Sequence, residues 1–279
     1  MLSVGVMQGR LLPPYEGRFQ AFPAATWREE FRIGQKAGVA CIEWIYEEPH
    51  QDQNPIATPE GRAAMRQIAA ETGVAVRSVC ADYFMTARLI NRDGSRNPDS
   101  VARLRAVLDW SADLGITYVV LPFVDISTVA SPPEWDALIA LLKEFAPLAE
   151  SRRVELHLET SLPPRLFAHI LRQVNSPWVR ANYDSGNSAA LGYDQRDELR
   201  QLRGMVGSCH IKDRVLGGRT VPLSTGNCDF DAVFGELRIA GFDRWFILQA
   251  ARGEAGQEGP LAIANIAFVT RGWTAARAA

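Results

Sequence analysis

Long apolar runs are missing from this sequence of 279 residues, and none reaches the roughly 18 residues that a membrane-spanning helix needs. The first ten residues carry no basic region ahead of apolar ones, so they predict a first strand rather than a signal peptide. Neither sign of charge is in excess, because 30 Lys and Arg face 32 Asp and Glu. The resulting formal net charge of -2 gives no indication of a nucleic-acid or membrane partner.

Cysteine is also scarce. The four cysteines are Cys41, Cys80, Cys209 and Cys228, and no two of them form a Cys-x-x-Cys pair. Three of them fall in predicted strands, where a free cysteine usually behaves as a small buried hydrophobic residue. We therefore predict a reduced, cytoplasmic protein without a structural zinc site.

A regular alternation of strand and helix is what the sequence does contain. No low-complexity linker interrupts it, and each unit spans about 30 to 35 residues, the size of a βα unit. Eight apolar segments rich in Val, Ile and Leu are predicted to be strands, which suits a parallel sheet covered on both faces. They are 2–7, 39–46, 74–80, 116–121, 154–159, 179–184, 206–211 and 244–249. The pattern predicts one (β/α)8 TIM barrel over residues 1–279.

Helix boundaries between these strands are marked by capping residues. Thr26 is the predicted N-cap of a helix that stops at Gly38, and Pro59 is the predicted first residue of a helix that ends at Gly73. An open, doubly wound sheet is the alternative architecture. It is disfavoured because no Gly-x-Gly-x-x-Gly follows the first strand.

Each of the last four predicted strands ends on a residue that can bind a metal. These residues are Glu159, Asp184, His210 and Gln249. Parallel strands of a barrel bring their carboxyl ends together at one face, so the four side chains are expected to meet there. Two carboxylates, an imidazole and an amide oxygen suit one divalent ion, Mn²⁺ or Mg²⁺ in the first place, with Co²⁺ and Zn²⁺ as alternatives.

Side-chain alternation gives the fifth strand a polar face. Glu155, His157 and Glu159 share it, while the leucines between them face the other way. One charged residue pointing into a barrel is usually half of a buried ion pair, since an unpaired buried charge is costly. Several such residues at successive strand ends favour a metal site instead.

Further polar residues follow the strands nearby. Lys212, Arg214 and Arg252 lie after the seventh and eighth strands and are candidates to anchor a substrate. The loop 217–227 occupies a position where barrels often bind phosphate, but a solvated basic loop explains it equally well. Glu43 in the second strand is predicted to bind substrate, with a core ion pair as the alternative.

Several of these segments resemble the xylose-isomerase-like sugar phosphate isomerase/epimerase superfamily, and within it the hexulose- and pentulose-phosphate 3-epimerases and the relatives of tagatose 3-epimerase. The resemblance covers nearly the whole chain. It is carried by Gly5-Val6-Met7-Gln8-Gly9-Arg10, Ile42-Glu43-Trp44, His157-Leu158-Glu159, Asp184-Ser185-Gly186-Asn187, His210-Ile211-Lys212-Asp213 and Gly226-Asn227-Cys228-Asp229-Phe230.

The resemblance implies a barrel that binds one divalent ion through Glu159, Asp184, His210 and Gln249. In the epimerases two glutamates exchange protons with opposite faces of the substrate, and they match Glu159 and Gln249. Gln249 is neutral and cannot take a proton, so an aldose–ketose isomerisation, or a dehydration that needs one base, fits this sequence better than two-base epimerisation.

The predicted function is therefore a metal-dependent isomerase or epimerase that acts on a sugar or sugar phosphate through an enediolate. Glu159 is the predicted base, Lys212 polarises the carbonyl, and His157 is a second proton carrier. Two alternatives stay open: a dehydratase on the same scaffold, and a non-catalytic sugar-binding barrel that lost its second base. The expected partner is the small sugar itself, and a homo-oligomer is compatible with the sequence.

Overall fold

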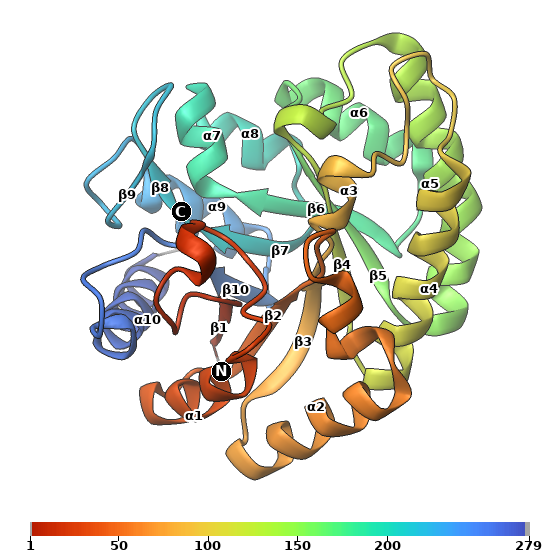
Figure 1. The fold of residues 1–279 in the computed structure, drawn as a ribbon. Helices are drawn as coiled ribbons and strands as arrows, with labels where there is room; N and C mark the ends of the chain where they lie inside the picture. The colour runs from red at the N-terminus through yellow and green to blue at the C-terminus, as the bar shows by residue number, and fades with distance from the viewer. Residues whose placement is uncertain (1, 277–279) are drawn as a thin grey trace.

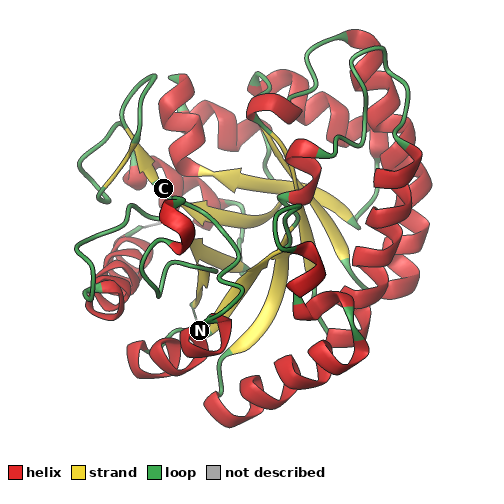
Figure 2. Ribbon diagram, in the orientation of Figure 1, coloured by secondary structure: helices red, strands yellow, loops and turns green. Residues whose placement is uncertain are grey.

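Eight parallel strands close into a barrel in the computed structural model, which describes residues 2–276 (Figure 1). Around the barrel the strands follow the order β1, β10, β7, β6, β5, β4, β3, β2. Helices surround the strands on the outside, as Figure 2 shows by colour. The predicted TIM barrel is thus confirmed. None of the described helices combines the length and the apolar character needed to cross a membrane.

The strand positions agree closely with the predicted ones. The strands are β1 Ser3–Met7, β2 Cys41–Ile45, β3 Ala75–Cys80, β4 Tyr118–Phe123, β5 Glu155–Thr160, β6 Val179–Asp184, β7 Val206–Ile211 and β10 Trp245–Leu248. The fourth strand differs most, since it begins and ends two residues later than predicted and includes Pro122. Pro122 is tolerated because the ladder with β3 already ends at Val120, so Pro122 lies beside β5 alone.

The main helices join successive strands. They are α1 Trp27–Ala37, α2 Pro59–Thr72, α4 Pro98–Leu114, α5 Pro132–Arg152, α6 Pro164–Val174, α9 Phe230–Ile239 and α10 Glu258–Ala275, with the short helices α3 Tyr83–Thr86, α7 Ser185–Leu191 and α8 Gln195–Gln201 between them. Gly38 and Gly73 end α1 and α2 with positive φ, as predicted. Thr26 is the N-cap residue of α1, as predicted, but its side chain makes no cap hydrogen bond to the helix.

Packing of α1 on β2 illustrates how the barrel is covered. Trp27, Phe31 and Gly34 are buried and stand at helical spacing, so they form one face of α1. The rings of Trp27 and Trp44 meet edge to face with their centroids 5.4 Å apart. This contact fixes the start of α1, and therefore the end of the long loop between β1 and α1.

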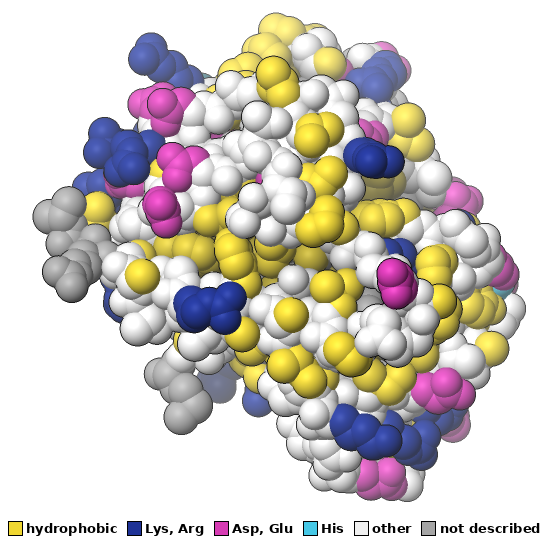
Figure 3. All heavy atoms as spheres, turned by 90° about the vertical axis from the view of Figure 1, so that its left-hand side faces the viewer, with side chains coloured by type: hydrophobic (Ala, Val, Ile, Leu, Met, Phe, Trp, Pro, Cys, Tyr) yellow, Lys and Arg dark blue, Asp and Glu magenta, His cyan; other side chains and the backbone are white. Residues whose placement is uncertain are grey.

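Two irregular segments cover the carboxyl ends of the strands. One is the β1–α1 loop, residues 8–26. The other is a hairpin of β8, Asp213–Arg214, and β9, Thr220–Val221, which follows β7. Figure 3 shows the side of the molecule on the left of Figure 1, where the hairpin and α10 lie, and hydrophobic side chains gather across that face. The site is built beneath these segments.

Candidate metal centre and substrate pocket

Three of the four predicted metal ligands meet at the carboxyl ends of their strands. Glu159 in β5, Asp184 at the end of β6 and His210 in β7 each present one ligand atom, and these atoms lie within 4.8 Å of one another. All three side chains are buried. The register places Asp184 directly opposite His210, so the sheet itself holds this pair.

A hydrogen bond from beneath orients the imidazole of His210. Its Nε2 lies 2.6 Å from Glu43 Oε1, and Glu43 in turn accepts a hydrogen bond of 2.6 Å from Ser78. The other ring nitrogen, Nδ1, is buried without a hydrogen-bond partner among residues 2–276, and it lies 3.4 Å from Glu159 Oε2 and 3.9 Å from Asp184 Oδ2. Burial opposes protonation of His210, but the Glu43 and Glu159 carboxylates outweigh it and raise its pKa to about 10.

The two carboxylates of the cluster are oriented by amide donors. Asn187 Nδ2 donates to Glu159 Oε1 at 2.6 Å, and Asn182 Nδ2 approaches Glu159 Oε2 at 3.4 Å. The two carboxylate oxygens of Asp184 have different partners. Its Oδ1 accepts from the backbone N–H of Asn187 at 2.8 Å and caps α7, while Oδ2 faces His210.

Lys212 and Gln249 complete the polar group. Lys212 Nζ donates to Asp184 Oδ2 at 3.2 Å and to Gln249 Oε1 at 3.0 Å, so the carbonyl oxygen of Gln249 is turned toward the cluster. The amide nitrogen of Gln249 donates to Gln20 Oε1 at 2.8 Å. The structure therefore brings Gln249 beside the other three predicted ligands, linked to them through Lys212.

Four of the residues described above, Glu159, Asn187, Lys212 and Gln249, line one wall of a pocket of about 410 Å³, whereas Asp184 and His210 are not part of its lining. The opposite wall comes from the loops after β2, β3 and β4 and from the β1–α1 loop. The lining includes Arg18, Gln20, Glu47, Asp82, Pro122, Asp125, Glu159, Asn187, Lys212, Arg214 and Gln249. Arg214, one of the predicted substrate-binding residues, is thus on the pocket wall, where it donates to Asn187 Oδ1 at 2.9 Å.

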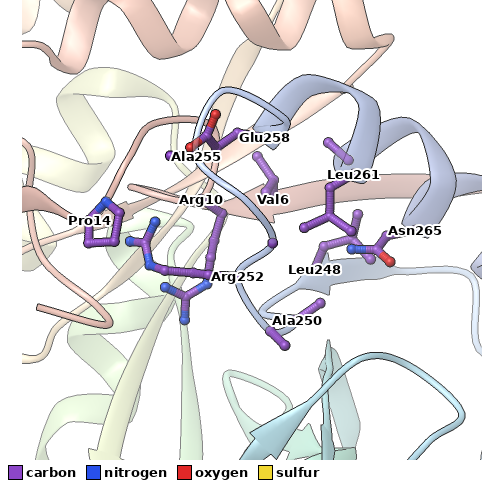
Figure 4. A pocket seen from close by; sticks show the side chains of 13 residues that line it. Val6, Arg10, Pro14, Leu248, Ala250, Arg252, Ala255, Glu258, Leu261 and Asn265 are labelled. Carbon is purple, nitrogen blue, oxygen red and sulfur yellow. The ribbon is translucent and has the colours of Figure 1, made fainter.

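Arg252 is not brought to this pocket. It lines a separate, apolar cavity of about 230 Å³ between β1, β10 and α10, beside Arg10 and Leu261 (Figure 4). Its guanidinium donates to the backbone oxygens of Leu12 and Phe19, both at 2.9 Å. The position of Arg252 therefore suits a clamp on the β1–α1 loop rather than a contact with substrate.

His157 and Glu43 also lie away from the pocket wall. His157 is fully buried, stacks on Tyr118 with ring centroids 4.3 Å apart, and is hydrogen-bonded at 2.8 Å to both Ser208 and Glu155. It shares a strand face with Glu159, as predicted, but two residues along a strand is a step of roughly 6.6 Å, which puts it one layer deeper. Glu43 contacts His210 instead of facing the pocket.

Among the pocket residues that were not predicted, Asp82, Gln20 and Asn187 are hydrogen-bonded into the site. Asp82 follows β3, and Gln20 reaches the pocket from the β1–α1 loop and donates to Asp82 Oδ2 at 2.8 Å. Asn187 belongs to the segment after Asp184, but its hydrogen bond to Glu159 depends on the geometry of α7. Asp82 could have been found by examining the ends of all eight strands, whereas the position of Gln20 in a long loop has no sequence pattern.

The residues present fit a divalent ion. A buried imidazole nitrogen has no hydrogen-bond partner among the described residues, and it faces oxygens of two carboxylates. Glu43 holds the proton-bearing nitrogen on the far side of the ring, which is the arrangement that metal-ligating histidines commonly adopt. Oxygen and nitrogen donors without a thiolate suit a hard or borderline cation.

Comparison with known proteins gives a consistent result. The family model described as xylose isomerase-like TIM barrel matches residues 31–271. Among curated proteins, the L-ribulose-5-phosphate 3-epimerase UlaE of Salmonella paratyphi C is 27% identical over 235 residues, which are 80% of this chain and 82% of that protein. The enzyme of the same name from Shigella flexneri serotype 5b is 26% identical over the same shares.

Solved structures share the fold at lower identity. An L-ribulose 3-epimerase superimposes with a TM-score of 0.72 at 18% identity, covering 98% of this chain and 95% of that one. A D-allulose 3-epimerase from Methylomonas sp. gives 0.73 at 16% identity, with 97% and 98% covered. The 3-keto-D-glucoside 4-epimerase YcjR of E. coli gives 0.70 at 15% identity, with 97% and 100% covered.

Proposed function

Since the chain belongs to the xylose isomerase-like TIM-barrel family, we propose that it is a divalent-metal-dependent epimerase or isomerase of a sugar or sugar phosphate. The observation that carries this proposal is the buried cluster of Glu159, Asp184 and His210 at the carboxyl ends of the strands. The names of the curated relatives, which are 3-epimerases of a ketose phosphate, support the substrate class.

In this proposal Glu159, Asp184 and His210 hold the ion, with Gln249 Oε1 as the fourth protein ligand. A bound Mn²⁺ or Mg²⁺ would supply Lewis-acid stabilisation of negative charge on adjacent substrate oxygens. Co²⁺ and Zn²⁺ are the alternatives that the donor set accepts. Asn187 and Asn182 keep the Glu159 carboxylate turned toward the pocket, and Glu43 keeps Nδ1 of His210 free to coordinate.

Glu159 is the proposed base. It belongs to the ligand cluster and also lines the pocket, so a substrate carbon next to a carbonyl can lie within reach of its carboxylate. Removal of a proton there leaves an enediolate, whose negative oxygen needs a nearby positive charge or donor. Lys212 lines the pocket and contacts Asp184 and Gln249 beside Glu159, and we assign it the role of polarising the substrate carbonyl.

Arg214 is the proposed anchor for a phosphate end. No described carboxylate forms an ion pair with Arg214. Arg18, which lines the same pocket, differs in this respect because its guanidinium lies 2.7 Å from the carboxylate of Glu47. A guanidinium bound only by neutral oxygens keeps its charge available for a phosphate. The position of Arg214 in the hairpin after β7 agrees with the usual place of phosphate sites in TIM barrels.

The test has two parts, both on the full-length protein. Metal content after dialysis should be about one ion per chain in the wild type, and Asp184→Ala or His210→Ala should reduce it sharply. The surface variant Asp136→Asn, whose residue is exposed on α5, serves as the control. Full metal occupancy in both ligand variants would exclude the proposed site.

The second part measures chemistry in deuterated water with Mn²⁺ and a panel of ketoses and ketose phosphates that includes L-ribulose 5-phosphate. Deuterium entering the sugar, followed by NMR, would support isomerisation or epimerisation, and Glu159→Gln should abolish it. An absence of exchange with every sugar would contradict the proposal.

A second candidate function is dehydration, because the neutral Gln249 stands where two-base epimerisation would need a second base. A dehydratase requires only one base at this carbon, and the same incubation would reveal it by an absorbing or dehydrated product. A sugar-binding barrel would give neither product nor exchange.

All four cysteines are free in the structure, which supports our proposal of a reducing, cytoplasmic location.

A further inference from the structure

The pocket needs a second proton carrier if it is to exchange protons on both faces of a substrate, and Gln249 cannot be that group. Other ionisable side chains on the pocket wall are already engaged or exposed. Glu47 is bound by Arg18 at 2.7 Å and accepts the backbone N–H of Phe22 at 2.6 Å. Asp125 is exposed to solvent. Asp82 is the remaining candidate among the ionisable residues that line the pocket.

Asp82 is held by neutral donors. Gln20 Nε2 donates to its Oδ2 at 2.8 Å, and the thiol of Cys80 donates to its Oδ1 at 3.2 Å. No ion pair to Asp82 occurs within residues 2–276. Burial, followed by the Glu159 and Glu47 carboxylates, raises the pKa of Asp82 to about 6, even though both hydrogen bonds act in the other direction. The carboxyl group can therefore both lose and gain a proton near neutral pH.

The barrel places Asp82 on a different side of the pocket from Glu159. It follows β3, which is four strands from β7 in either direction around the closed sheet and two strands from β5, so Asp82 faces the strand of His210 and stands on a different side of the pocket from Glu159. Asp82 and Glu159 line the same pocket. A substrate bound between them would meet the two carboxyl groups from different sides of the pocket.

Two hydrogen bonds through Gln20 join Asp82 to Gln249, the residue that stands at the position of the second epimerase base. Gln249 Nε2 donates to Gln20 Oε1 at 2.8 Å, and Gln20 Nε2 donates to Asp82. An amide at residue 249 is required for this direction of donation, because a carboxylate there would present a second acceptor to Gln20 Oε1. Gln249 thus fixes the orientation of Gln20, and Gln20 fixes that of Asp82.

We propose that Asp82 is the second proton-transferring residue of the pocket, acting on the substrate face turned away from Glu159. This inference rests on the proposed function. Glu159 takes the proton from the carbon beside the carbonyl, the C–H electron pair becomes a C=C bond, and the carbonyl π pair moves to oxygen. Asp82 then gives its proton to the same carbon from the other side, the C=C pair forms the new C–H bond, and the carbonyl re-forms. Water returns both carboxyl groups to their starting states.

The variant Asp82→Asn separates the two proton transfers. Asparagine has nearly the same shape and can still accept from Gln20, but it cannot carry the proton. With L-ribulose 5-phosphate and Mn²⁺ in deuterated water, the variant should keep deuterium exchange into the starting sugar within about threefold of wild type and lose epimer formation by about 100-fold or more. Metal content and the thermal unfolding midpoint should match those of the control Asp136→Asn, whose residue is exposed on α5.

Each result has a distinct meaning. Epimer formation by Asp82→Asn at the wild-type rate would overturn the assignment of Asp82 and leave the proposed function standing. Equal loss of exchange and epimer formation, with metal content intact, would also overturn it, because Asp82 would then act in the first transfer. A wild-type protein that exchanges no deuterium with any sugar of the panel would remove the proposed function, and the role of Asp82 with it.

Discussion

Replacing Glu43 by Gln should weaken metal binding, although Glu43 touches neither the pocket nor the proposed ion. Glu43 Oε1 lies 2.6 Å from Nε2 of His210, so its carboxylate stands on the far side of the imidazole ring from the ligand atom Nδ1. Glu43→Gln keeps an acceptor for the Nε2 proton and removes one negative charge. The tautomer and the ring position should survive, while the attraction between the carboxylate and the ion is lost.

The size of the effect follows from the geometry. Across an imidazole ring the carboxylate and the ion are roughly 8 Å apart, and a pair of unit charges at that distance attracts by roughly 2 kcal/mol at an effective dielectric constant of about 20. That energy corresponds to about 30-fold in Kd, within the range of about 10- to 100-fold that is typical for groups that orient metal ligands.

The assay is a Mn²⁺ titration of the metal-free protein by calorimetry, or by the electron paramagnetic resonance signal of free Mn²⁺. Ser78→Ala is the matched control, because it removes the 2.6 Å hydrogen bond to Glu43 and leaves the carboxylate charge in place. We expect Ser78→Ala to change Kd by less than about threefold. A Glu43→Gln protein that binds Mn²⁺ within twofold of the wild type would refute this reasoning.

Three other substitutions have defined outcomes. Arg214→Met should raise KM for a ketose phosphate by about tenfold or more and leave KM for the free ketose nearly unchanged, with the exposed Arg219→Met as control; equal changes would mean that Arg214 does not read phosphate. Gln249→Glu should tighten Mn²⁺ binding in the same titration, since it adds a charge beside the ligands; a weaker affinity would contradict the proposed ligand set. Burial raises the pKa of Glu30 from 4.5 to about 8, so the stabilisation by its protonated form is fully present below about pH 4.5 and is lost as the pH rises through 8. In urea unfolding, the free energy of unfolding of Glu30→Gln should therefore rise by up to roughly 5 kcal/mol relative to that of the wild type between pH 5 and 9. A difference between the two proteins that does not change with pH would exclude this linkage.

The fold was predictable because the strands and helices have strong local patterns. All eight strands of the barrel lie within two residues of their predicted bounds, and the glycines after α1 and α2 end those helices. Strand β4 is the informative difference. Pro122 suggests a strand end by its missing N–H, but the neighbouring ladder stops before it, and only the tertiary structure decides that.

The ligand cluster was predictable for a similar reason, because strand ends in a barrel converge. How deep in the barrel a given side chain lies was not predictable. His157 and Glu43 have the residue types of a site, but one lies a layer below the pocket and the other beneath His210. Gln20 was missed because it belongs to a loop whose course depends on the contacts of Arg10 and Arg252 with the backbone oxygen of Phe19.

The two oxygens of Asp184 connect ion binding to local order. Oδ1 caps α7, a helix of seven residues, and so short a helix depends on its cap and its packing for persistence. An ion on Oδ2 would restrain the carboxylate and, with it, the first turn of α7. Amide hydrogen exchange at Asn187 should therefore slow when metal binds, which makes the protection of one backbone N–H a measure of site occupancy that needs no substrate.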